Sequence, residues 1–259
     1  MTVFVSIVSH GHGDLIRELN CVSNLIDDFQ VIVKSNKSGD DYKEFVCSQN
    51  FHWINDNYDL GFGKNNNVNY NYCKSVLGMN PDDIFIVLNP DVLVNNKDVF
   101  SLINRMNADG VLIATINLCK SFEPLIYDFS VRKFPQLFDF VSSFLGLGNS
   151  TILDKKNIKC SIEVDWAAGS FLAFKASHYA FLFGFDEKYF MYCEDTDICL
   201  RSGNLGHKPI FYPDIFALHL AKHSNRRLFS RHFFWHIRSV FRFLSSRRGL
   251  TKPSSSVII

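Results

Sequence analysis

The feature that most constrains the fold is a repeated alternation of short β-rich apolar runs with segments whose apolar residues recur at helical spacing. The apolar runs predict strands at residues 3–9, 31–33, 52–54 and 84–88. Helices are expected over residues 15–26, from about residue 41, and from the loop 59–63 through residue 73. Such alternation builds a mostly parallel central sheet with helices on both faces. The sequence therefore predicts an α/β fold whose ligands bind at the carboxyl ends of the strands.

Length and composition favour one domain with a short appendage. The chain has 259 residues, of which 47% are hydrophobic and 20% charged, so a sizeable core can be buried and global disorder is excluded. No apolar run approaches the roughly 20 residues needed to span a bilayer. The seven cysteines lie scattered, and no charged-then-apolar leader precedes the first apolar run. We therefore expect free thiols and a reducing, cytoplasmic setting. Nucleic acid is not expected as a partner.

Asp91 follows a strongly apolar expected strand. Residues 84–88 end at Asn89-Pro90-Asp91, and Pro90 prevents further strand pairing. A carboxylate at the carboxyl end of a buried strand would bind a hard cation through oxygen, and the cation would neutralise a diphosphate. The alternative is an ordinary turn aspartate, which is favoured for this motif taken alone.

A glycine-containing loop is a second candidate. In Gly61-Phe62-Gly63 the glycines would let the backbone approach a nucleotide closely, and the amides of Asn66 and Asn67 would offer donors and acceptors to a base, ribose or phosphate. The same stretch is also consistent with a loop and an asparagine-rich helix start that binds no ligand. The spacing of a P-loop is absent.

The segment 184–201 is the most informative part of the chain. Its aromatic residues lead to Glu194 and Asp195 at an expected helix start, where backbone N–H groups favour ionised carboxylates. For Asp195, the packing of acids behind aromatic residues indicates a partly desolvated carboxylate suited to proton abstraction. For Asp197 we expect only an i,i+4 surface ion pair with Arg201.

Two further segments contain candidate ligand-binding side chains. Trp166 would stack on a sugar or lipid-linked acceptor where its ring is exposed, or it would pack in the core, and the sequence favours neither. His219 and His223 are spaced i,i+4, but two histidines without a third ligand rarely establish a zinc site. A zinc hydrolase is therefore rejected.

In this order, the motifs resemble those of inverting family-2 glycosyltransferases, and in particular those of bacterial rhamnosyltransferases of O-antigen and cell-wall polysaccharide assembly. The resemblance covers residues 3 to about 223. It is carried by the apolar strand with Asn89-Pro90-Asp91, by Gly61-Phe62-Gly63 with Asn66-Asn67, and by the stretches 127–135, 165–170 and 184–201. The last of these is the most specific.

The resemblance implies a GT-A fold with a nucleotide-sugar-binding half, about residues 1–115, and an acceptor-binding half, residues 116–225. It implies a donor such as dTDP-L-rhamnose, a polyprenyl-diphosphate-linked saccharide as acceptor and a divalent metal, Mg²⁺ or Mn²⁺. Asp195 falls on the family's catalytic base, and Asp91 and His219 fall on metal-binding positions. The donor is expected to contact Ser9, Asn36, Gly61, Phe62, Gly63, Asn66, Asn67, Asn89 and Asp91, and the acceptor Asp165, Trp166, Gly169 and Glu194.

Two positions depart from the family pattern. Ser35 stands at the end of the second expected strand, where the family often has an aspartate near the donor base, and Asp59 stands where asparagine is common. These differences bear on recognition of the nucleobase and leave the reaction class unchanged.

The implied reaction is one direct displacement that inverts the anomeric centre. Asp195 would take the proton from an acceptor hydroxyl, while Asp91 and the metal stabilise the departing diphosphate. Two other classes stay open: a noncatalytic nucleotide-sugar-binding assembly protein and a nucleotidyltransferase. The presence of both acids argues against the first. The lack of a glycine-rich, Lys- or Arg-containing phosphate loop near the first strand argues against the second.

The C-terminal part of the chain differs in charge from the rest. From Ile215 onward there are nine basic residues and no acidic one, whereas the preceding residues carry eight more acidic than basic residues. Residues 226–259 are expected to form a basic aromatic helix and tail. The helix would attach the protein peripherally to the inner face of the cytoplasmic membrane, with arginines beside anionic headgroups. A helix packed on the acidic catalytic domain is equally favoured, and the two are compatible.

Overall fold

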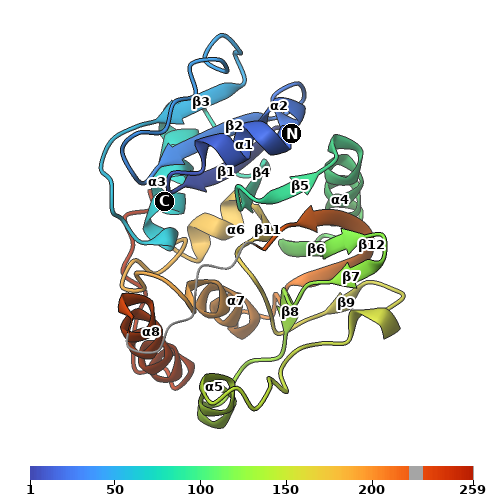
Figure 1. Ribbon diagram of the computed structural model, residues 1–259, viewed down its shortest axis with the longest axis vertical. Helices are drawn as coiled ribbons and strands as arrows, with labels where there is room; N and C mark the ends of the chain where they lie inside the picture. The colour runs from blue at the N-terminus through green and yellow to red at the C-terminus, as the bar shows by residue number, and fades with distance from the viewer. Residues whose placement is uncertain (222–229, 259) are drawn as a thin grey trace.

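The strands form a mixed, mostly parallel sheet. The computed structural model describes residues 1–221 and 230–258, and within them ten strands join in one sheet (Figure 1). Strands β11 and β5 run antiparallel to their neighbours, and the other six strands of the main order share one direction. The order is β3 (Phe51–Ile54), β2 (Gln30–Ser35), β1 (Val3–Ser9), β4 (Ile84–Leu88), β11 (Phe171–Lys175), β6 (Ile113–Phe122), β12 (Ile210–His219) and β5 (Val92–Val94). The four predicted strands and the mostly parallel sheet are confirmed.

Short strands extend this sheet and form a separate ribbon beside it. β7 (Leu125–Tyr127) pairs with β6, and β9 (Ile162–Glu163) pairs with β12. β8 (Val131–Arg132) pairs with β10 (Trp166–Ala167) outside the main sheet. The predicted boundary between two halves at residue 115 falls inside β6, so the main sheet is continuous across it.

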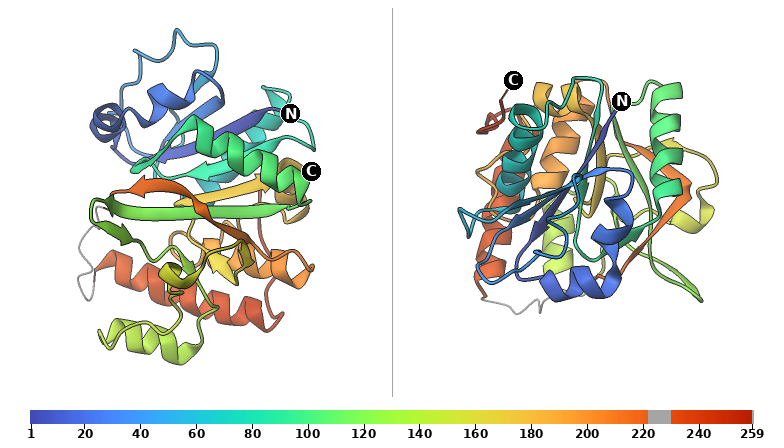
Figure 2. Two further views of the ribbon diagram at one scale, coloured as in Figure 1. Left: turned by 90° about the vertical axis from the view of Figure 1, so that its right-hand side faces the viewer. Right: turned by 90° about the horizontal axis from the view of Figure 1, so that it is seen from above.

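Helices cover both faces of the sheet (Figure 2). Successive side chains of β1 alternate between two cores, because a strand has a period of two: Val5 and Ile7 lie in one core and Phe4 in the other. The first core is closed by α1 (Gly13–Leu19), α2 (Cys21–Leu25) and α4 (Asn96–Ala108). The second is closed by α3 (Phe62–Ser75), α6 (Ala176–Phe181) and α7 (Glu194–Asn204).

A further layer lies outside α7. Ile198 of α7 faces the sheet, whereas Leu200 packs against Val240 and Phe243 of α8 (Arg231–Arg247). Helix α5 (Leu137–Phe144) joins this outer cluster through Phe140. Within residues 1–221 and 230–258, no helix combines the length and the apolar character needed to cross a bilayer.

Two helix predictions are wrong in detail. The predicted helix 15–26 is split into α1 and α2 at Asn20, whose φ of 52° is left-handed, a conformation that asparagine tolerates better than most residues. The helix predicted from about residue 41 is a series of turns. Its backbone hydrogen bonds join residues three apart, as in turns. The fully buried side chain of Tyr42 packs in the first core, and the carbonyl of Asp41 accepts a hydrogen bond from Arg17 Nη1. These two contacts hold the segment to the first core.

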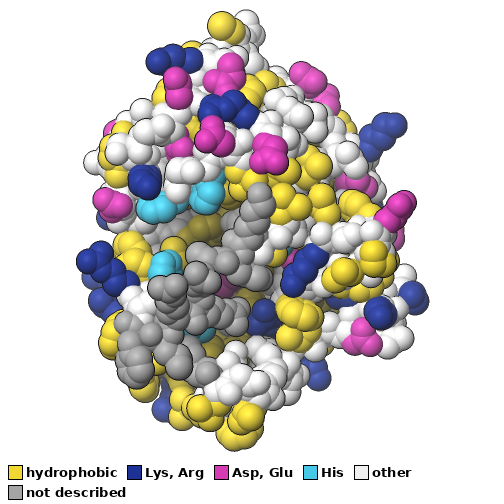
Figure 3. All heavy atoms as spheres, in the orientation of Figure 1, with side chains coloured by type: hydrophobic (Ala, Val, Ile, Leu, Met, Phe, Trp, Pro, Cys, Tyr) yellow, Lys and Arg dark blue, Asp and Glu magenta, His cyan; other side chains and the backbone are white. Residues whose placement is uncertain are grey.

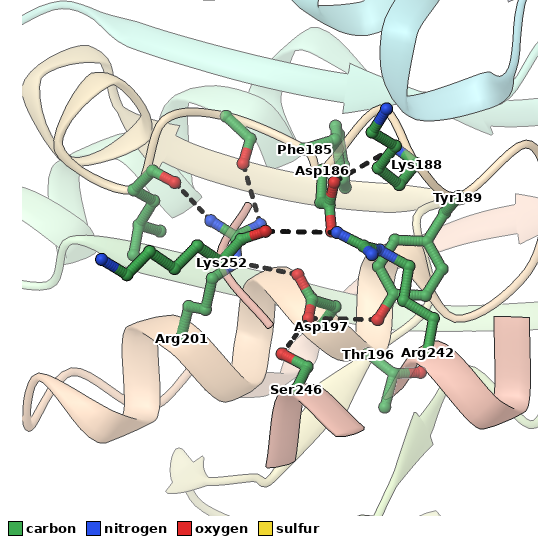
Figure 4. A network of polar contacts seen from close by, with 12 residues as sticks. Phe185, Asp186, Lys188, Tyr189, Thr196, Asp197, Arg201, Arg242, Ser246 and Lys252 are labelled. Carbon is green, nitrogen blue, oxygen red and sulfur yellow. Dashed lines mark hydrogen bonds and ion pairs between the residues drawn. The ribbon is translucent and has the colours of Figure 1, made fainter. Parts of the chain in front are cut away.

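Asp197 is buried, so the prediction of a surface ion pair is wrong (Figure 4). Its pairing with Arg201 is present, with Nε donating to Oδ2 over 2.8 Å. The second oxygen, Oδ1, accepts from Ser246 Oγ at 2.6 Å and from the hydroxyl of Tyr189 at 3.2 Å. Since Ser246 lies on α8, this carboxylate joins α7, α8 and the segment that precedes α7.

A second ion pair supports the same junction. Asp186 is buried and accepts from Arg242 Nε at 2.7 Å, and Arg242 lies on α8 (Figure 4). Asp186 Oδ1 accepts in turn from the backbone N–H groups of Lys188 and Ser254. The chain before α7 and the chain after α8 are therefore attached to each other through one carboxylate.

Replacement of Asp197 by alanine is expected to destabilise the protein by about 3 kcal/mol, because breaking a buried ion pair leaves an uncompensated charge, Arg201. Arg201 retains the carbonyls of Leu182 and Gly184, which places the cost at the lower end for such pairs. Urea unfolding at neutral pH measures it. Asp214→Ala is the control: it breaks the exposed pair with Arg105 and should cost less than about 1 kcal/mol. Equal costs in the two variants would contradict the assignment.

Candidate active site

The loops that follow the parallel strands are tied together at one edge of the sheet. β1 and β2 end side by side, and the N–H of Asn36 donates to the carbonyl of Ser9 over 2.6 Å. The N–H of Gly13, at the start of α1, donates to Asp40 Oδ1 at 3.2 Å. Asp91 follows β4, the neighbour of β1 on its other side. This carboxyl edge therefore brings together residues that are far apart in the sequence.

A chain of ionisable side chains leads inward from Asp91. His219, the last residue of β12, has its Nε2 3.6 Å from Asp91 Oδ1. Its Nδ1 lies 2.8 Å from Oδ2 of the buried Asp128, so Nδ1 donates to this carboxylate and Nε2 faces Asp91. Asp128 Oδ1 accepts from the buried Lys155 Nζ at 2.7 Å, and Lys155 also donates to Ser130 Oγ.

The charges of this chain compensate each other inside the protein. Burial acts to raise the pKa of Asp128, but the hydrogen bond from His219 and the ammonium of Lys155 outweigh it and hold that pKa well below its usual range. Burial lowers the pKa of Lys155. Asp128 is thus an ionised acceptor that fixes the orientation of His219.

Asp91 and His219 fit the requirements of a divalent cation. Their 3.6 Å separation is too long for a hydrogen bond, but it is comparable with the roughly 3 Å between adjacent ligands of one ion with ligand bonds of about 2.1 Å. No group of three His, Cys, Asp or Glu side chains suited to a metal occurs in the described part of the chain. Two protein ligands are enough for ions that keep waters and bind substrate phosphates. His223 lies outside the described residues.

Asp195 is held at the start of α7, as predicted. Its Oδ2 accepts from the N–H of Gly169 at 3.0 Å, and its Oδ1 accepts from the N–H of Thr196 at 2.7 Å. Burial raises the pKa of Asp195 above its ordinary value, although both N–H groups and the positive charge of Arg132 oppose the shift. A fixed carboxylate with a raised pKa is suited to act as a general base.

The segment before α7 has a strained backbone that α8 supports. Tyr192 and Cys193 have φ angles of 73° and 63°, which bulky residues rarely adopt. Ser239 Oγ of α8 donates to the carbonyl of Met191 at 2.9 Å, and the hydroxyl of Tyr192 lies 3.1 Å from His232 Nδ1. The rings of Phe190 and Trp235 are 4.4 Å apart. Helix α8 therefore helps to set the position of Asp195.

The glycines of the 61–63 loop are required by packing. A Cβ at Gly61 would lie 2.6 Å from the carbonyl oxygen of Phe190, and one at Gly63 would lie 2.6 Å from Phe185 Cβ. Both glycines are buried, so packing against Phe190 and Phe185 accounts for them, and their direct contact with the donor stays a prediction. Phe62, between them, is partly exposed, and its contact with the donor stays a prediction.

Three other residues predicted to contact the donor have fully buried side chains: Ser9, Asn66 and Asn67. Ser9 Oγ accepts from the N–H of His12, and Asn66 Oδ1 accepts from Ser6. Asn67 uses both ends of its amide within the protein, donating to the carbonyl of Phe185 and accepting from its N–H. These side chains are therefore engaged inside the protein, and their direct contact with the donor stays a prediction.

Asn36, Asn89 and the departures from the family pattern lie at the same edge. The amide of Asn36 forms two hydrogen bonds with the backbone of Leu60, so it fixes the 57–61 loop. The N–H of Asn89 donates to the carbonyl of Ser170, which links the Asp91 loop to the Gly169 turn. Ser35 Oγ accepts from the indole of Trp53. Direct donor contacts of Asn36 and Asn89 stay predictions.

On the acceptor side, three of four predicted contacts are buried. Trp166 is only 9% exposed, with its indole N–H donating to the carbonyl of Lys133, so its ring packs in the core, and contact with an acceptor stays a prediction. Gly169 is buried and its N–H bonds to Asp195. Glu194 is also buried, and burial together with Asp195 raises its pKa well above the usual range. Asp165 is partly exposed and pairs with Lys208.

Known proteins resemble this chain in sequence and in fold. No family model matches it. The rhamnosyltransferase WbbL of Escherichia coli is 37% identical over 254 residues, which cover 96% of this chain and 95% of that protein. The chain belongs to the rhamnosyltransferase family.

Two further similarities fit this family. The N-acetylglucosaminyl-diphospho-decaprenol L-rhamnosyltransferase of Mycobacterium tuberculosis is 38% identical over 86 residues, 33% of this chain and 28% of that protein. The mannosyltransferase PcManGT of Pyrobaculum calidifontis, solved with GDP-Man and Mn²⁺, superposes with a TM-score of 0.59 at 15% identity. The superposition covers 97% of this chain and 65% of that structure, and it supports the GT-A glycosyltransferase fold.

Three features of this rhamnosyltransferase site were not found from the sequence. Asp128 and Lys155, which orient His219, lie 91 and 64 residues before it in the sequence. Arg132, whose positive charge opposes the rise in the pKa of Asp195, lies 63 residues before Asp195. Asp128 and Arg132 both lie in the 127–135 stretch that carries part of the family resemblance, which was the available signal. No pattern in the sequence indicated that α8 contacts the segment before Asp195.

Replacement of Gly61 by alanine is expected to destabilise the protein by about 1–3 kcal/mol, because the new Cβ would meet a backbone carbonyl that cannot rotate away. Chemical denaturation measures the loss. The matched control is Gly203→Ala in α7, where the Cβ meets only Lys208 Cγ at 3.6 Å. That change should be neutral or stabilising by up to about 1 kcal/mol through helix propensity. A tolerated Gly61→Ala would show that the α3 terminus is not packed as described.

Proposed function

We propose that this rhamnosyltransferase moves L-rhamnose from dTDP-L-rhamnose to a saccharide linked to polyprenyl diphosphate, with inversion at the anomeric carbon. The observation that carries the proposal is the carboxylate of Asp195, fixed by the N–H groups of Gly169 and Thr196 and raised in pKa by burial. The relative that acts on N-acetylglucosaminyl-diphospho-decaprenol supports N-acetylglucosamine as the acceptor sugar.

In the proposed reaction, Asp195 accepts the proton of an acceptor hydroxyl. The hydroxyl oxygen forms a bond to the anomeric carbon as the bond from that carbon to the diphosphate breaks, and the electron pair leaves with the diphosphate. One displacement inverts the centre. No second carboxylate is needed as a nucleophile, which separates this site from a retaining glycoside hydrolase.

The proposed metal site consists of Asp91 and His219. Both residues would bind Mg²⁺ or Mn²⁺ together with the donor diphosphate, and the cation would stabilise the negative charge that develops on the leaving group. Asp128 and Lys155 keep Nε2 of His219 turned toward Asp91. These residues therefore orient the donor while Asp195 serves the acceptor.

A donor panel tests the proposed substrates. The protein is incubated with dTDP-L-rhamnose, UDP-N-acetylglucosamine or GDP-mannose, together with a polyprenyl-diphosphate-linked N-acetylglucosamine, and the product is identified by mass spectrometry. A rhamnosyl product from the first donor alone is expected. Transfer from another donor only would overturn the sugar assignment, and release of a nucleotidyl product would favour the nucleotidyltransferase alternative.

Asp195→Asn is expected to retain fold and donor binding and to lose transfer by a factor of about 10²–10⁴, because an amide cannot accept the proton. In the parent protein kcat/KM should fall as the pH decreases, since protonation removes the base, and the raised pKa of Asp195 places this fall above the pH expected for an ordinary aspartate. Rate measurements across pH and calorimetric donor titration check both points. Transfer by the variant at the parent rate would refute the assignment.

Replacement of Asp91 or His219 by alanine is expected to weaken metal-dependent donor binding, more severely for Asp91 because it supplies negative charge. Calorimetric titration of donor with and without Mg²⁺ or Mn²⁺ measures the effect. Glu18→Ala, which removes an exposed acid on α1, is the control and should leave the metal dependence unchanged. An unchanged metal dependence in Asp91→Ala would exclude a metal role for this residue.

We also propose peripheral attachment to the inner face of the cytoplasmic membrane, where a lipid-linked acceptor is embedded. The buried contacts of α8 support the packed-helix alternative, and its exposed side supports the membrane alternative. Four exposed residues, spaced three or four apart, lie along that side: Arg231, Phe234, Arg238 and Phe241. Arg248, just after the helix, is exposed as well. Residues 226–229 and 259 of the predicted segment 226–259 lie outside the described part of the chain.

A further inference from the structure

We propose that α5 and the turn that follows it insert into the surface of an anionic lipid bilayer. This inference deepens the proposed function, since it names the surface that holds a lipid-linked acceptor near Asp195. Five large apolar side chains within eleven residues are between 44% and 76% exposed, far more than a core helix would leave in water. They are Leu137, Phe138, Val141, Leu145 and Leu147.

These side chains are held in place and project from the protein. Phe140, on the other side of α5, is buried and contacts the rings of Phe243 and His236 of α8 at 6.4 and 6.2 Å. Ser150 Oγ donates to Asp139 Oδ1 at 2.7 Å, which folds the turn back onto the helix. One side of α5 is therefore fixed against α8, while its exposed side chains form an amphipathic surface.

The shape of this region favours a bilayer over a protein partner. Helix α5 lies at one end of the molecule, beside α8, in two perpendicular views (Figures 1 and 2). Figure 3 shows apolar side chains gathered at that end of the molecule, on its outermost surface. Protruding side chains insert between lipid headgroups without a matching cavity, whereas a protein partner would need one.

The charges around α5 complement anionic headgroups. Asp139 is the one acidic residue between positions 137 and 148, and it already accepts from the N–H of Gln136 and from Ser150. Arg247 of α8 donates to the carbonyl of Pro135, which places the basic end of α8 at the start of α5. No acidic residue follows Asp214 in the sequence. An apolar helix flanked by arginines is the pattern of a helix that lies in a membrane interface.

The same surface is linked to the catalytic base through Arg132. Arg132, whose charge acts on Asp195, precedes α5 by five residues, and Lys133 next to it is exposed. Five residues of extended chain span at most about 18 Å. The N–H of Phe134 donates to Asp165 at 3.0 Å, so this connection is fixed to the acceptor side of the site. A bilayer at α5 would present a lipid-linked diphosphate to the Arg132–Lys133 stretch.

Vesicle flotation with point variants tests the inference without removing α8, whose loss would also disturb Asp197 and the 190–193 segment. The test variant combines Phe138→Ser, Leu145→Ser and Leu147→Ser. The control combines Val46→Ser, Phe181→Ser and Leu205→Ser, which removes three side chains that are 48–66% exposed elsewhere. Thermal melting verifies that both variants fold.

The parent and the control should float with phosphatidylglycerol vesicles, and the test variant should bind them at least tenfold more weakly. Binding of all three proteins should be weaker to phosphatidylcholine vesicles and at high salt. Equal flotation of test variant and parent would overturn the proposal, as would no flotation of the parent or an equal loss in the control. Sedimentation showing that the parent associates with itself through α5 would assign the surface to a second copy and overturn the proposal also.

A transfer assay separates this inference from the proposed function. With an acceptor embedded in vesicles, the test variant should show a raised KM, whereas with a water-soluble short-chain acceptor its kcat and KM should equal those of the parent. An equal loss on both acceptors would indicate damage to the site and would contradict a membrane role for α5. Absence of transfer by the parent would contradict the proposed function alone, because flotation needs no reaction.

Discussion

The arrangement of the catalytic side of this protein depends on one buried carboxylate, Asp197. It is located in the first turn of α7, and it is bonded to Arg201 on the same helix, to Tyr189 before it and to Ser246 on α8. A buried charge is tolerated only where it is paired and hydrogen-bonded, so these three partners must be present together. The position of α7 between the sheet and α8 satisfies that requirement, and the helix start that supports Asp195 is positioned with it.

The left-handed backbone at Tyr192 and Cys193 is the local cost of this arrangement. Contacts from α8 to the 190–193 segment offset the strain, and the close approach at Gly61 lets the N-terminus of α3 pack against Phe190. The C-terminal helix is therefore part of the catalytic unit as well as a candidate for contact with lipid. Its two sides have separate roles: Val240 and Phe243 are buried, while arginine and phenylalanine alternate on the exposed side.

A second buried ion pair organises the part of the candidate site around Asp91. Lys155 and Asp128 compensate each other in the interior, and Asp128 determines which nitrogen of His219 faces Asp91. Both halves of the candidate site thus follow one principle: a partly exposed carboxylate of the site depends on an ion pair behind it whose acidic partner is buried. Asp91 and Asp195 are connected through the hydrogen bond from Asn89 to Ser170, next to Gly169.

The sequence by itself determined four strands of a mostly parallel sheet, the position of Asp91 after a buried strand, and the helix start at Glu194. These features follow from the spacing of apolar residues and from residues adjacent in the chain. The burial of Asp197, the packing role of Gly61 and the orientation of His219 were decided only by the tertiary structure. Each depends on a partner far away in the sequence: Ser246 is 49 residues from Asp197, Phe190 lies more than a hundred residues after Gly61, and Asp128 is 91 residues from His219. Local periodicity carries no record of such pairs, because they form only when the chain has folded.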